Sequence, residues 1–520
     1  MQNASLSTRA KWSFAHWLEI ETDRAAFHCG AHSATRAQLL HASQRAAAHL
    51  STLGFRRGDV LALWIPDGGC WLQFLFAAAQ LGVLVVPIST RYRRDEARHV
   101  LATSRARGLV VSTDFLGFDY AALARAIQAD LPHLQHLMSV RTGDGFFVVD
   151  ATLPAVGATG TRSDPLCTFS TSGTTGSPKL AVHDQGGIAL HGENVAAGMD
   201  IRQGDRMLCA LSLYGVLGFV QAMAALAGGA ACVFLQVYNA QAAAGAIEKY
   251  GVTHFFGADG IFDPVLNTRG HSLASWRCGG FAEFAGLGAK VVAQAEHELG
   301  LRLIAIYGSS ECFAIAAAQS PGHAADRRVV PGGTPIADGI EFRVVDADTG
   351  EPVGDDVRGE LQIRGYNVMS GYLNNPVATE AALTRDGWFR TGDLAYRKGS
   401  EFVYLARLKD GLRLRGYLVE PAEIEEFLKR HEAVADVQVV GINRIGEGDI
   451  AIAFVRVRGE SASEPDILAW CKAGIANYKV PRRVLFVDAF PQVEGPNGTK
   501  ILKNKLREMA EQAVGSAATT

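Results

Sequence analysis

The hydrophobic positions in the N-terminal part of the chain alternate between short apolar runs and longer amphipathic segments. The apolar runs at residues 60–65 and 83–86 are predicted to form buried strands. Apolar residues recur with helical spacing at residues 37–53, and residues 71–81 and 94–103 are also predicted to be helices. Short apolar strands separated by helices of this length are typical of βαβ units and parallel sheets. The pattern therefore predicts an α/β fold built from layered subdomains.

The character of the chain changes after Pro331. Strand-like segments joined by glycine-rich turns follow and predict a β-rich lobe, at residues 341–345, 359–364 and 401–405. Pro421 then opens a predicted helix whose first turn is acidic. We therefore predict a large N-terminal domain at residues 1–408 and a small α+β C-terminal domain at residues 409–520.

One long uncharged stretch could suggest a membrane span, because no charged residue occurs between Arg206 and Glu248. However, two adjacent glycines at positions 228 and 229 divide the stretch into a helix-like half at residues 220–227 and a strand-like half at residues 231–237. Helix, glycine turn and buried strand fit a layered α/β core, so we predict no integral membrane span.

The composition excludes several further classes of function. The 520 residues are 48% hydrophobic and 20% charged, which is typical of globular proteins. The 50 basic and 53 acidic residues nearly cancel, so a nucleic-acid partner is not expected. No two of the eight cysteines have C-x2-C spacing, and the N-terminal MQNASLSTRAKWSFAHW has no apolar signal-peptide core. These features favour a globular protein of the reducing cytoplasm.

The most informative segment is FSTSGTTGSPK at residues 169–179. Glycines let backbone N–H groups converge on an anion, hydroxyl side chains add donors, and Lys179 supplies positive charge. Because Pro178 precedes this lysine, the segment is not a Walker A loop. We predict that it binds phosphate through Thr171, Ser172, Gly173, Thr174, Thr175, Gly176 and Lys179.

This segment resembles the signature loop of the adenylate-forming superfamily, which includes acyl-CoA synthetases, peptide-synthetase adenylation domains and luciferases. Similar motifs follow in the family's order over nearly the whole chain: YGSSE at 307–311, GYL at 371–373, DGWFRTGD at 386–393, ARLKD at 406–410, LRGY at 414–417 and PNGTKI at 496–501. Serine replaces the family's threonine at position 310, and alanine replaces its glycine at position 406. The resemblance implies an AMP-forming ligase that uses ATP, Mg²⁺ and coenzyme A.

The implied reaction has two halves. A carboxylate attacks the α-phosphate of ATP to give an acyl-adenylate and pyrophosphate, and a thiol then displaces AMP. Three side chains are implied to be catalytic: Ser310 donates to the α-phosphate, Glu311 ligates Mg²⁺, and Lys500 neutralises the charge between carboxylate and phosphate. No general base is needed, because the attacking carboxylate is already ionised.

The remaining implied contacts bind the nucleotide and admit the thiol. Five residues are implied to contact adenine or ribose: Gly279, Gly280, Tyr307, Asp393 and Arg407. Because Lys500 must leave before a thiol enters, the family rotates its mobile C-terminal domain, and Lys409 occupies the implied hinge. Gly416 is the implied passage for the pantetheine arm of coenzyme A.

The acid pocket is predicted from two weaker matches. Where ligases of this family often carry P-x-x-H-x-x-G, this chain has SLYGVLG, so Gly215 replaces the histidine and leaves room for a bulkier acid. In a second element, GADG at 257–260, Asp259 either binds an amino or hydroxyl group or caps a helix at residues 260–266. The predicted wall is mostly apolar and consists of Tyr214, Gly215, Asp259, Phe281 and Cys312.

Three functions remain open at this point. A carboxylate–CoA ligase is favoured by the length and by Gly416 with its neighbouring tyrosine. An enzyme that loads the phosphopantetheine of a carrier protein is the first alternative. A non-catalytic ATP-binding relative is the second, and it is disfavoured by the joint presence of Lys179, Glu311, Asp393, Arg407 and Lys500. The sequence specifies neither the acid, whether aryl, branched or fatty, nor the oligomeric state or pathway.

Overall fold

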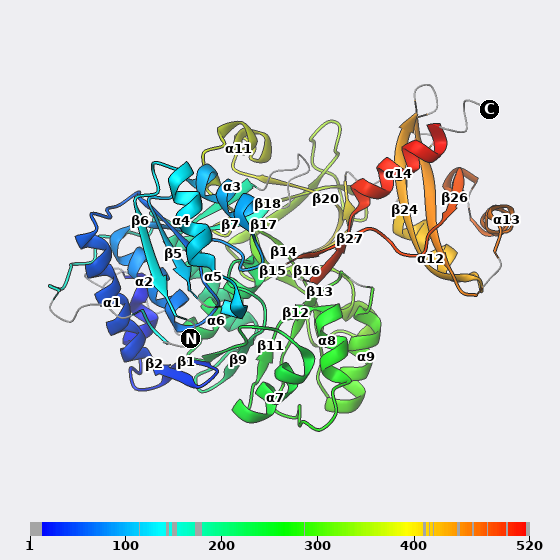
Figure 1. Cartoon of the computed structure of the whole chain (residues 1–520). Coiled ribbons are helices and arrows are strands. Elements are labelled where there is room, and N and C mark those ends of the chain that lie inside the picture. The colour runs from blue at the N-terminus through cyan, green and yellow to red at the C-terminus, as the bar shows by residue number, and fades with distance from the viewer. Residues whose placement is uncertain are drawn as a thin grey trace. The chain divides into compact units, whose positions relative to one another are not determined.

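The computed structural model describes residues 13–113, 115–141, 145–147, 153–171, 179–284, 286–408, 412–414, 417–419, 421–444, 448–459, 462–475, 477–495 and 498–515. The chain divides into two compact units (Figure 1). Unit 1 comprises Met1–Phe342 and Ile363–Phe389, and unit 2 comprises Arg343–Gln362 and Arg390–Thr520. The functional boundary predicted between residues 408 and 409 falls inside unit 2 and stays a prediction.

The largest sheet of unit 1 has seven strands in the order β19-β8-β7-β4-β3-β5-β6. The bounds are Gly371–Tyr372, Lys179–Asp184, Pro165–Thr171, Leu84–Pro87, Val60–Trp64, Gly108–Ser112 and His136–Val140 in that order. Neighbouring strands in the series β7, β4, β3, β5 and β6 are parallel, and β8 runs antiparallel to both β7 and β19. The predicted strands at 60–65 and 83–86 are β3 and β4, so the parallel α/β pattern is confirmed.

A second sheet of unit 1 has the order β11-β9-β10-β1-β2, with bounds His254–Phe255, Arg206–Cys209, Ala231–Phe234, Ala25–Cys29 and His32–Thr35. The third sheet contains β12, β13, β14, β15 and β16, with bounds Gly257–Ala258, Gly280–Ala282, Ile304–Ser309, Phe313–Ala318 and Gly332–Pro335. In this sheet β12, β13 and β14 are parallel, whereas β14, β15 and β16 are antiparallel. The chain therefore reverses direction between β14 and β15, at the predicted YGSSE motif.

Caps encoded in the sequence define some of the helix ends of unit 1. Thr35 and Gln38 form a reciprocal capping box at the start of α1, and Gly82 ends α2 in the left-handed conformation. The helices are α1 (Arg36–Thr52), α2 (Gly69–Leu81), α3 (Arg94–Ser104), α4 (Tyr120–Asp130), α5 (Gln185–Gly198), α6 (Val216–Ala227), α7 (Ala240–Tyr250), α8 (Asp259–Leu266), α9 (Gly288–Leu299), α10 (Ala325–Arg328) and α11 (Pro376–Ala382), with short 3-10 turns at Phe14–Glu19 and Phe115–Gly117.

The uncharged stretch folds as the helix α6, a glycine turn and the strand β10. Every residue from Val216 to Leu226 is buried, because α6 packs against α5, β9, β10 and β15. A helix that is apolar on all sides belongs in a core, which explains the missing charges. No helix in the described part of the chain combines the length and apolarity needed to cross a bilayer.

Unit 2 contains the β-rich lobe and the C-terminal elements. The strands β17 and β18 extend from unit 1 into unit 2, and the order β21-β20-β18-β17 has bounds Glu401–Arg407, Phe389–Lys398, Arg358–Gly365 and Ile340–Val345. The remaining strands are β22 (Leu412–Leu414), β23 (Tyr417–Val419), β24 (Val434–Arg444), β25 (Gly448–Val457), β26 (Arg483–Phe486), β27 (Gln492–Gly495) and β28 (Gly498–Ile501). The helices α12 (Pro421–Lys429) and α14 (Lys503–Gly515) pack against β24, and α13 (Glu464–Gly474) packs against β26, with a 3-10 turn at Asn477–Lys479.

Candidate functional site

The predicted phosphate loop joins two paired strands. Thr171 ends β7, Lys179 begins β8, and the two residues stand opposite each other in the antiparallel register. The hydroxyl of Thr171 is buried and has no hydrogen-bond partner among the described residues. The other predicted loop residues lie outside the described residues: Ser172, Gly173, Thr174, Thr175 and Gly176. The hairpin thus brings a buried hydroxyl and a lysine to the two ends of the loop.

Tyr372 connects the loop lysine to the predicted metal ligand. The ammonium nitrogen of Lys179 lies 4.3 Å from the centroid of the Tyr372 ring, and the Tyr372 hydroxyl donates to Glu311 Oε1 at 2.8 Å. The short strand β19 makes this arrangement possible, because it pairs with β8 and places Tyr372 opposite Ala181. Two side chains of opposite charge therefore share one buried aromatic ring.

The predicted Ser310–Glu311 pair forms the turn between β14 and β15. The Ser310 hydroxyl donates to the carbonyl of Ser170 in β7 at 3.2 Å. The Glu311 carbonyl accepts from the Met369 N–H at 2.7 Å, and the next residue, Cys312, is fully buried. Both ends of this turn are thus fastened to neighbouring segments of unit 1.

Of the two predicted adenine glycines, Gly279 directly precedes β13 and Gly280 begins it, and β13 pairs with β14, which carries Tyr307. A Cβ on Gly279 would come within 2.7 Å of the Phe255 carbonyl, and one on Gly280 within 2.7 Å of the Ile306 side chain. Close packing of the parallel strands therefore requires both glycines. Phe281, which follows them, is fully buried.

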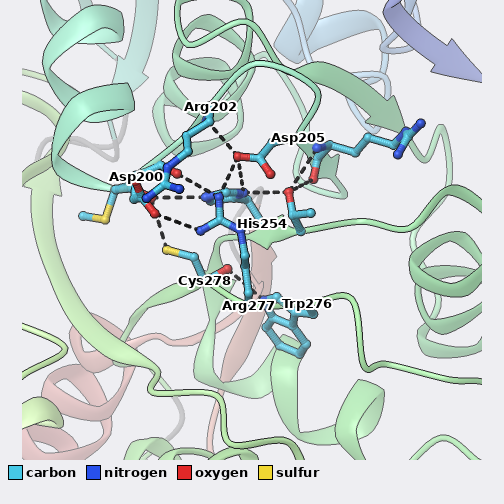
Figure 2. Close-up of polar contacts among 10 residues, drawn as sticks. Asp200, Arg202, Asp205, His254, Trp276, Arg277 and Cys278 are labelled. Atoms are coloured by element: carbon cyan, nitrogen blue, oxygen red, sulfur yellow. Dashed lines mark hydrogen bonds and ion pairs between the residues drawn. The ribbon is translucent and has the colours of Figure 1, made fainter.

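A polar cluster holds the segment that leads into these glycines (Figure 2). Arg277 donates to Asp205 Oδ2 at 2.7 Å and to Asp200 Oδ2 at 3.1 Å. His254, which is fully buried, lies beside them and contacts the carbonyl of Met199 at 3.1 Å from Nε2. Burial lowers the pKa of His254, which favours the neutral ring. The loop before β9 is thereby tied to the chain just ahead of Gly279.

In unit 2, the two predicted ribose residues lie side by side. Asp393 of β20 is opposite Arg407 of β21, and Arg407 Nη1 lies 3.0 Å from Asp393 Oδ1. Asp393 is buried, while the side chain of Arg407 is 54% exposed. Lys409 and Gly416 lie outside the described residues. Lys500 belongs to β28, where its backbone pairs with Val493 of β27.

Asp259 does not cap α8, so this interpretation of the sequence is wrong. The helix begins at Asp259 itself, with Ala258 at the N-cap and no side-chain cap bond. The carboxylate instead accepts from the backbone N–H groups of Phe284 at 3.0 Å and Leu287 at 2.8 Å. Asp259 is fully buried. Burial of the neighbouring Glu283, together with the charge of Asp259, raises the pKa of Glu283 to about 7. Asp259 therefore fixes the loop after β13.

The loop around Gly215 is anchored by a residue that the sequence did not single out. Asp67 Oδ1 accepts from the Leu213 N–H at 3.0 Å and from the Ser212 hydroxyl at 3.2 Å. Gly215 is the N-cap of α6 and has an extended conformation. Burial raises the pKa of Tyr214, so its hydroxyl stays protonated at neutral pH. Asp67 thus connects the loop after β3 to the predicted acid pocket.

Comparison with known proteins agrees with this architecture. Residues 14–373 match the family model for the AMP-binding enzymes, and residues 423–495 match the model for the C-terminal domain of these enzymes. The chain is 33% identical over 501 residues to the 3-[(3aS,4S,7aS)-7a-methyl-1,5-dioxo-octahydro-1H-inden-4-yl]propanoyl:CoA ligase of Mycobacterium tuberculosis, covering 91% of this chain and 94% of the relative. It is 30% identical over 514 residues to the mitochondrial medium-chain acyl-CoA ligase ACSF2 of Rattus norvegicus, covering 92% and 83%.

A solved structure, that of ATP-bound MatB from Rhodopseudomonas palustris, superimposes with a TM-score of 0.82 at 22% identity and covers 95% of this chain and 98% of that one. The chain belongs to the family of AMP-binding enzymes. The predicted family, the α/β architecture with a small C-terminal domain and the class of acid–thiol ligase are confirmed.

Three contacts near the site were not predicted: those of Tyr372, Asp67 and His183, whose ring contacts the Ser310 carbonyl at 2.8 Å. Tyr372 belongs to the GYL motif at 371–373, but the spacing of that motif does not indicate where its hydroxyl points. For Asp67 and His183 the sequence carries no local signal, because their partners are 146 and 127 positions away.

Proposed function

We propose that this chain activates a carboxylic acid with ATP and transfers the acyl group to the thiol of coenzyme A. The observation that carries the proposal is the arrangement of Lys179, Tyr372 and Glu311 in unit 1. A cation and a carboxylate lie against one tyrosine, next to a hairpin end that holds the buried hydroxyl of Thr171, which has no partner within the described part of the chain. Such a set can bind a polyphosphate and its counter-ion.

The first half-reaction joins two anions. A carboxylate oxygen of the acid bonds to the α-phosphorus, the bond from this phosphorus to the β-phosphate bridging oxygen breaks, and pyrophosphate leaves. The protein must therefore supply orientation and positive charge. We assign these roles to Lys179 at the phosphates, Ser310 at the α-phosphate and Lys500 at the reacting oxygens.

The second half-reaction forms the thioester. The sulfur of coenzyme A bonds to the acyl carbon, the bond from this carbon to the adenylate oxygen breaks, and AMP leaves, while the thiol proton passes to solvent. We assign the hinge to Lys409 and the pantetheine passage to Gly416. Asp393 and Arg407 hold the ribose in this scheme, which is supported by their 3.0 Å contact.

Glu311 is the residue proposed to hold Mg²⁺. Mg²⁺ in proteins is commonly bound by one or two carboxylates together with substrate phosphates, and Glu311 supplies one carboxylate beside the predicted phosphate loop. One of its oxygens accepts from Tyr372, which fixes the direction of the carboxylate. When bound, the metal neutralises phosphate charge.

The acid is proposed to be apolar beyond its carboxylate. Phe281 and Cys312 of the predicted pocket wall are fully buried apolar side chains. The carboxylate of Asp259, the one charge in the predicted wall, is directed at the N–H groups of Phe284 and Leu287. Relatives named for a medium-chain acid and for a bicyclic propanoyl group also support an apolar substrate.

A cytoplasmic location is proposed as well. All eight cysteines are free thiols, including the half-buried Cys29, Cys70 and Cys278. Free thiols are typical of a reducing compartment.

The test is ATP–pyrophosphate exchange with a panel of paired acids, each apolar acid beside its terminal amino analogue. We expect exchange with apolar members and weak exchange with the amino analogues. Omitting coenzyme A should abolish the release of AMP while ATP–pyrophosphate exchange persists. If a carrier protein replaces coenzyme A efficiently as the acyl acceptor, the assignment of coenzyme A is contradicted. Glu311→Gln serves as the inactive control. Tight ATP binding without exchange for any acid would overturn the proposal in favour of a non-catalytic relative.

A further inference from the structure

Phe313, two residues after the predicted metal ligand, lies between two histidine rings. The ring of His183, from β8, is 3.9 Å from the Phe313 ring centroid, with 24° between the planes. The ring of His191, from α5, is 4.8 Å away, with 16° between the planes. All three side chains are at most 2% exposed. The stack therefore joins a strand of the seven-stranded sheet, a helix and the start of β15.

The backbone in the stack is strained. Phe313 has a φ of 61° and Ile315 a φ of 60°, which is the left-handed region that favours glycine. A bulky or β-branched residue in this region costs about 1–3 kcal/mol and persists only where its surroundings enforce it. Gly308 on β14 allows the close approach, since a Cβ there would lie 2.2 Å from the Phe313 carbonyl. The turn from Ser310 to Phe313 is thus held in a conformation it would not adopt alone.

Each histidine also bonds to the backbone on one side of Phe313. His183 Nε2 donates to the Ser310 carbonyl and His191 Nε2 to the Ala314 carbonyl, both at 2.8 Å. Burial lowers the pKa of both rings to about 4, so each is neutral at physiological pH. A neutral ring has one N–H, and a carbonyl partner requires that proton on Nε2.

We propose that His183 is a positioning residue for the adenylation step, acting through the carbonyl of Ser310. This inference rests on the proposed function. Its ring supports Phe313 and its N–H fixes Ser310, whose hydroxyl is assigned to the α-phosphate. His191 makes the same kind of stack and bond, but at Ala314, on the far side of Phe313 from Ser310. The two histidines therefore make the same kind of stack with Phe313, but only His183 bonds to Ser310, and His191 Nδ1 also lies 3.5 Å from the Tyr366 hydroxyl.

The test compares His183→Phe with the matched variant His191→Phe. Phenylalanine preserves a ring against Phe313 and removes the bond to the carbonyl. Both variants should lose similar thermal stability. His183→Phe should lower kcat for ATP–pyrophosphate exchange roughly 10-fold to 100-fold, the effect expected of a misplaced reacting group, with little change in the KM of the acid. His191→Phe should retain kcat within about twofold.

Two further measurements separate positioning from packing. Thioester formation from supplied acyl-adenylate should be nearly normal in His183→Phe, because that step does not use the α-phosphate donor. His183→Gln, whose amide can donate to the carbonyl, should recover more exchange than the shorter His183→Asn. If His183→Phe does not fold, the comparison of exchange in His183→Gln and His183→Asn tests the inference in its place.

Equal kcat losses in the two phenylalanine variants, or equal losses in both half-reactions, would overturn the inference. Absence of exchange in the unmodified chain would instead overturn the proposed function, so the two failures are distinguishable.

Discussion

Tyr372 contacts both a lysine and a carboxylate of the proposed site. It offers its ring face to Lys179 and its hydroxyl proton to Glu311, and it is 7% exposed. A hydrogen bond to a charged group contributes about 1.5–3 kcal/mol. We therefore expect Tyr372→Phe, which retains the ring, to slow adenylate formation roughly 10-fold to 100-fold and to raise the Mg²⁺ concentration needed for half-maximal exchange.

Equilibrium binding of ATP, with and without Mg²⁺, gives a measurement independent of turnover. Tyr372→Phe should bind metal-free ATP normally and gain less from added Mg²⁺. Tyr372→Leu removes the cation–π contact as well and should weaken both. If Tyr372→Phe behaves like the unmodified chain while Tyr372→Leu is impaired, the hydroxyl has no role at Glu311.

The raised pKa of Asp67 leads us to expect that the stability of the fold depends on pH. Burial raises its pKa from 3.8 to about 6 in spite of bonds from Leu213 and Ser212. A raised carboxyl pKa means that the folded state disfavours the charged form, so this residue reduces stability as pH rises from about 4 through 6. The difference between the ordinary pKa of 3.8 and the folded-state pKa of about 6 corresponds to a loss of about 3 kcal/mol in the free energy of unfolding at neutral pH.

Asp67→Asn should therefore be more stable than the unmodified chain at pH 7.5, by up to about 3 kcal/mol, and equally stable near pH 4. The amide oxygen can still accept from Leu213. Thermal unfolding at both pH values measures the difference. An asparagine variant that is less stable at pH 7.5 would mean that the carboxylate is stabilised by its two bonds and that its pKa is not raised.

At the scale of elements, the Arg277 cluster fastens the loop before β9 to the entry of β13 (Figure 2). Arg277→Met keeps the apolar stem and leaves Asp205, which is 12% exposed, without its ion pair. We expect a loss of about 1–3 kcal/mol of stability and a raised KM for ATP, because the segment before Gly279 loosens. The matched control is Arg202→Met, whose ion pair with Asp200 is mostly exposed and should matter little.

The measurements are thermal unfolding and the ATP dependence of exchange. Arg277→Met should change KM more than kcat, since the cluster precedes the predicted adenine glycines Gly279 and Gly280 and contains none of the residues assigned to the reacting atoms. An Arg202→Met variant that is as impaired as Arg277→Met would show that general surface charge, rather than the specific pairing of Arg277 with Asp205, matters.

Regular elements were predictable where the signal is local. The helices α1, α2 and α3 begin and end within two residues of the predicted bounds, because signals such as the Thr35 cap of α1 and the glycine that ends α2 lie next to each segment in the chain. The pairing of β19 with β8 had no such signal, since two residues at 371–372 join a strand almost 200 positions earlier. This pairing is what brings Tyr372 to Glu311, so part of the site was beyond local patterns.

At the scale of the whole molecule, the proposed roles are divided between the two compact units. Lys500 belongs to unit 2, whereas Lys179 and Glu311 belong to unit 1. We expect Lys500→Ala to lower adenylate formation roughly 100-fold or more, because charge stabilisation at the reacting oxygens is lost. Thioester formation from supplied acyl-adenylate should stay nearly normal.

The matched control is Lys503→Ala, which removes a lysine three positions away whose ammonium lies 3.7 Å from Glu425 within the same unit. It should retain both half-reactions. Equal loss of the two half-reactions in Lys500→Ala would contradict its assignment to adenylation.

The proposed rotation of the C-terminal domain can be tested separately at Lys409. Proline fixes φ near −65°, so Lys409→Pro restricts the backbone change that a hinge requires. Thioester formation should fall at least 10-fold, while adenylation in the starting arrangement continues. Pre-steady-state measurement of each half-reaction distinguishes this result from general damage, in which both rates would fall together.

The sequence by itself determined the class of fold, the family, the reaction class and the order of the motifs, because each depends on residues that are close together in the chain. Tertiary structure alone decided the directions of the side chains: Asp259 turns to the loop after β13, Tyr372 reaches Glu311, and His183 stacks on Phe313. These contacts join residues 25 to 130 positions apart. Strand register and helix packing determine which of these side chains come into contact, and the spacing of residues within a motif does not encode such contacts.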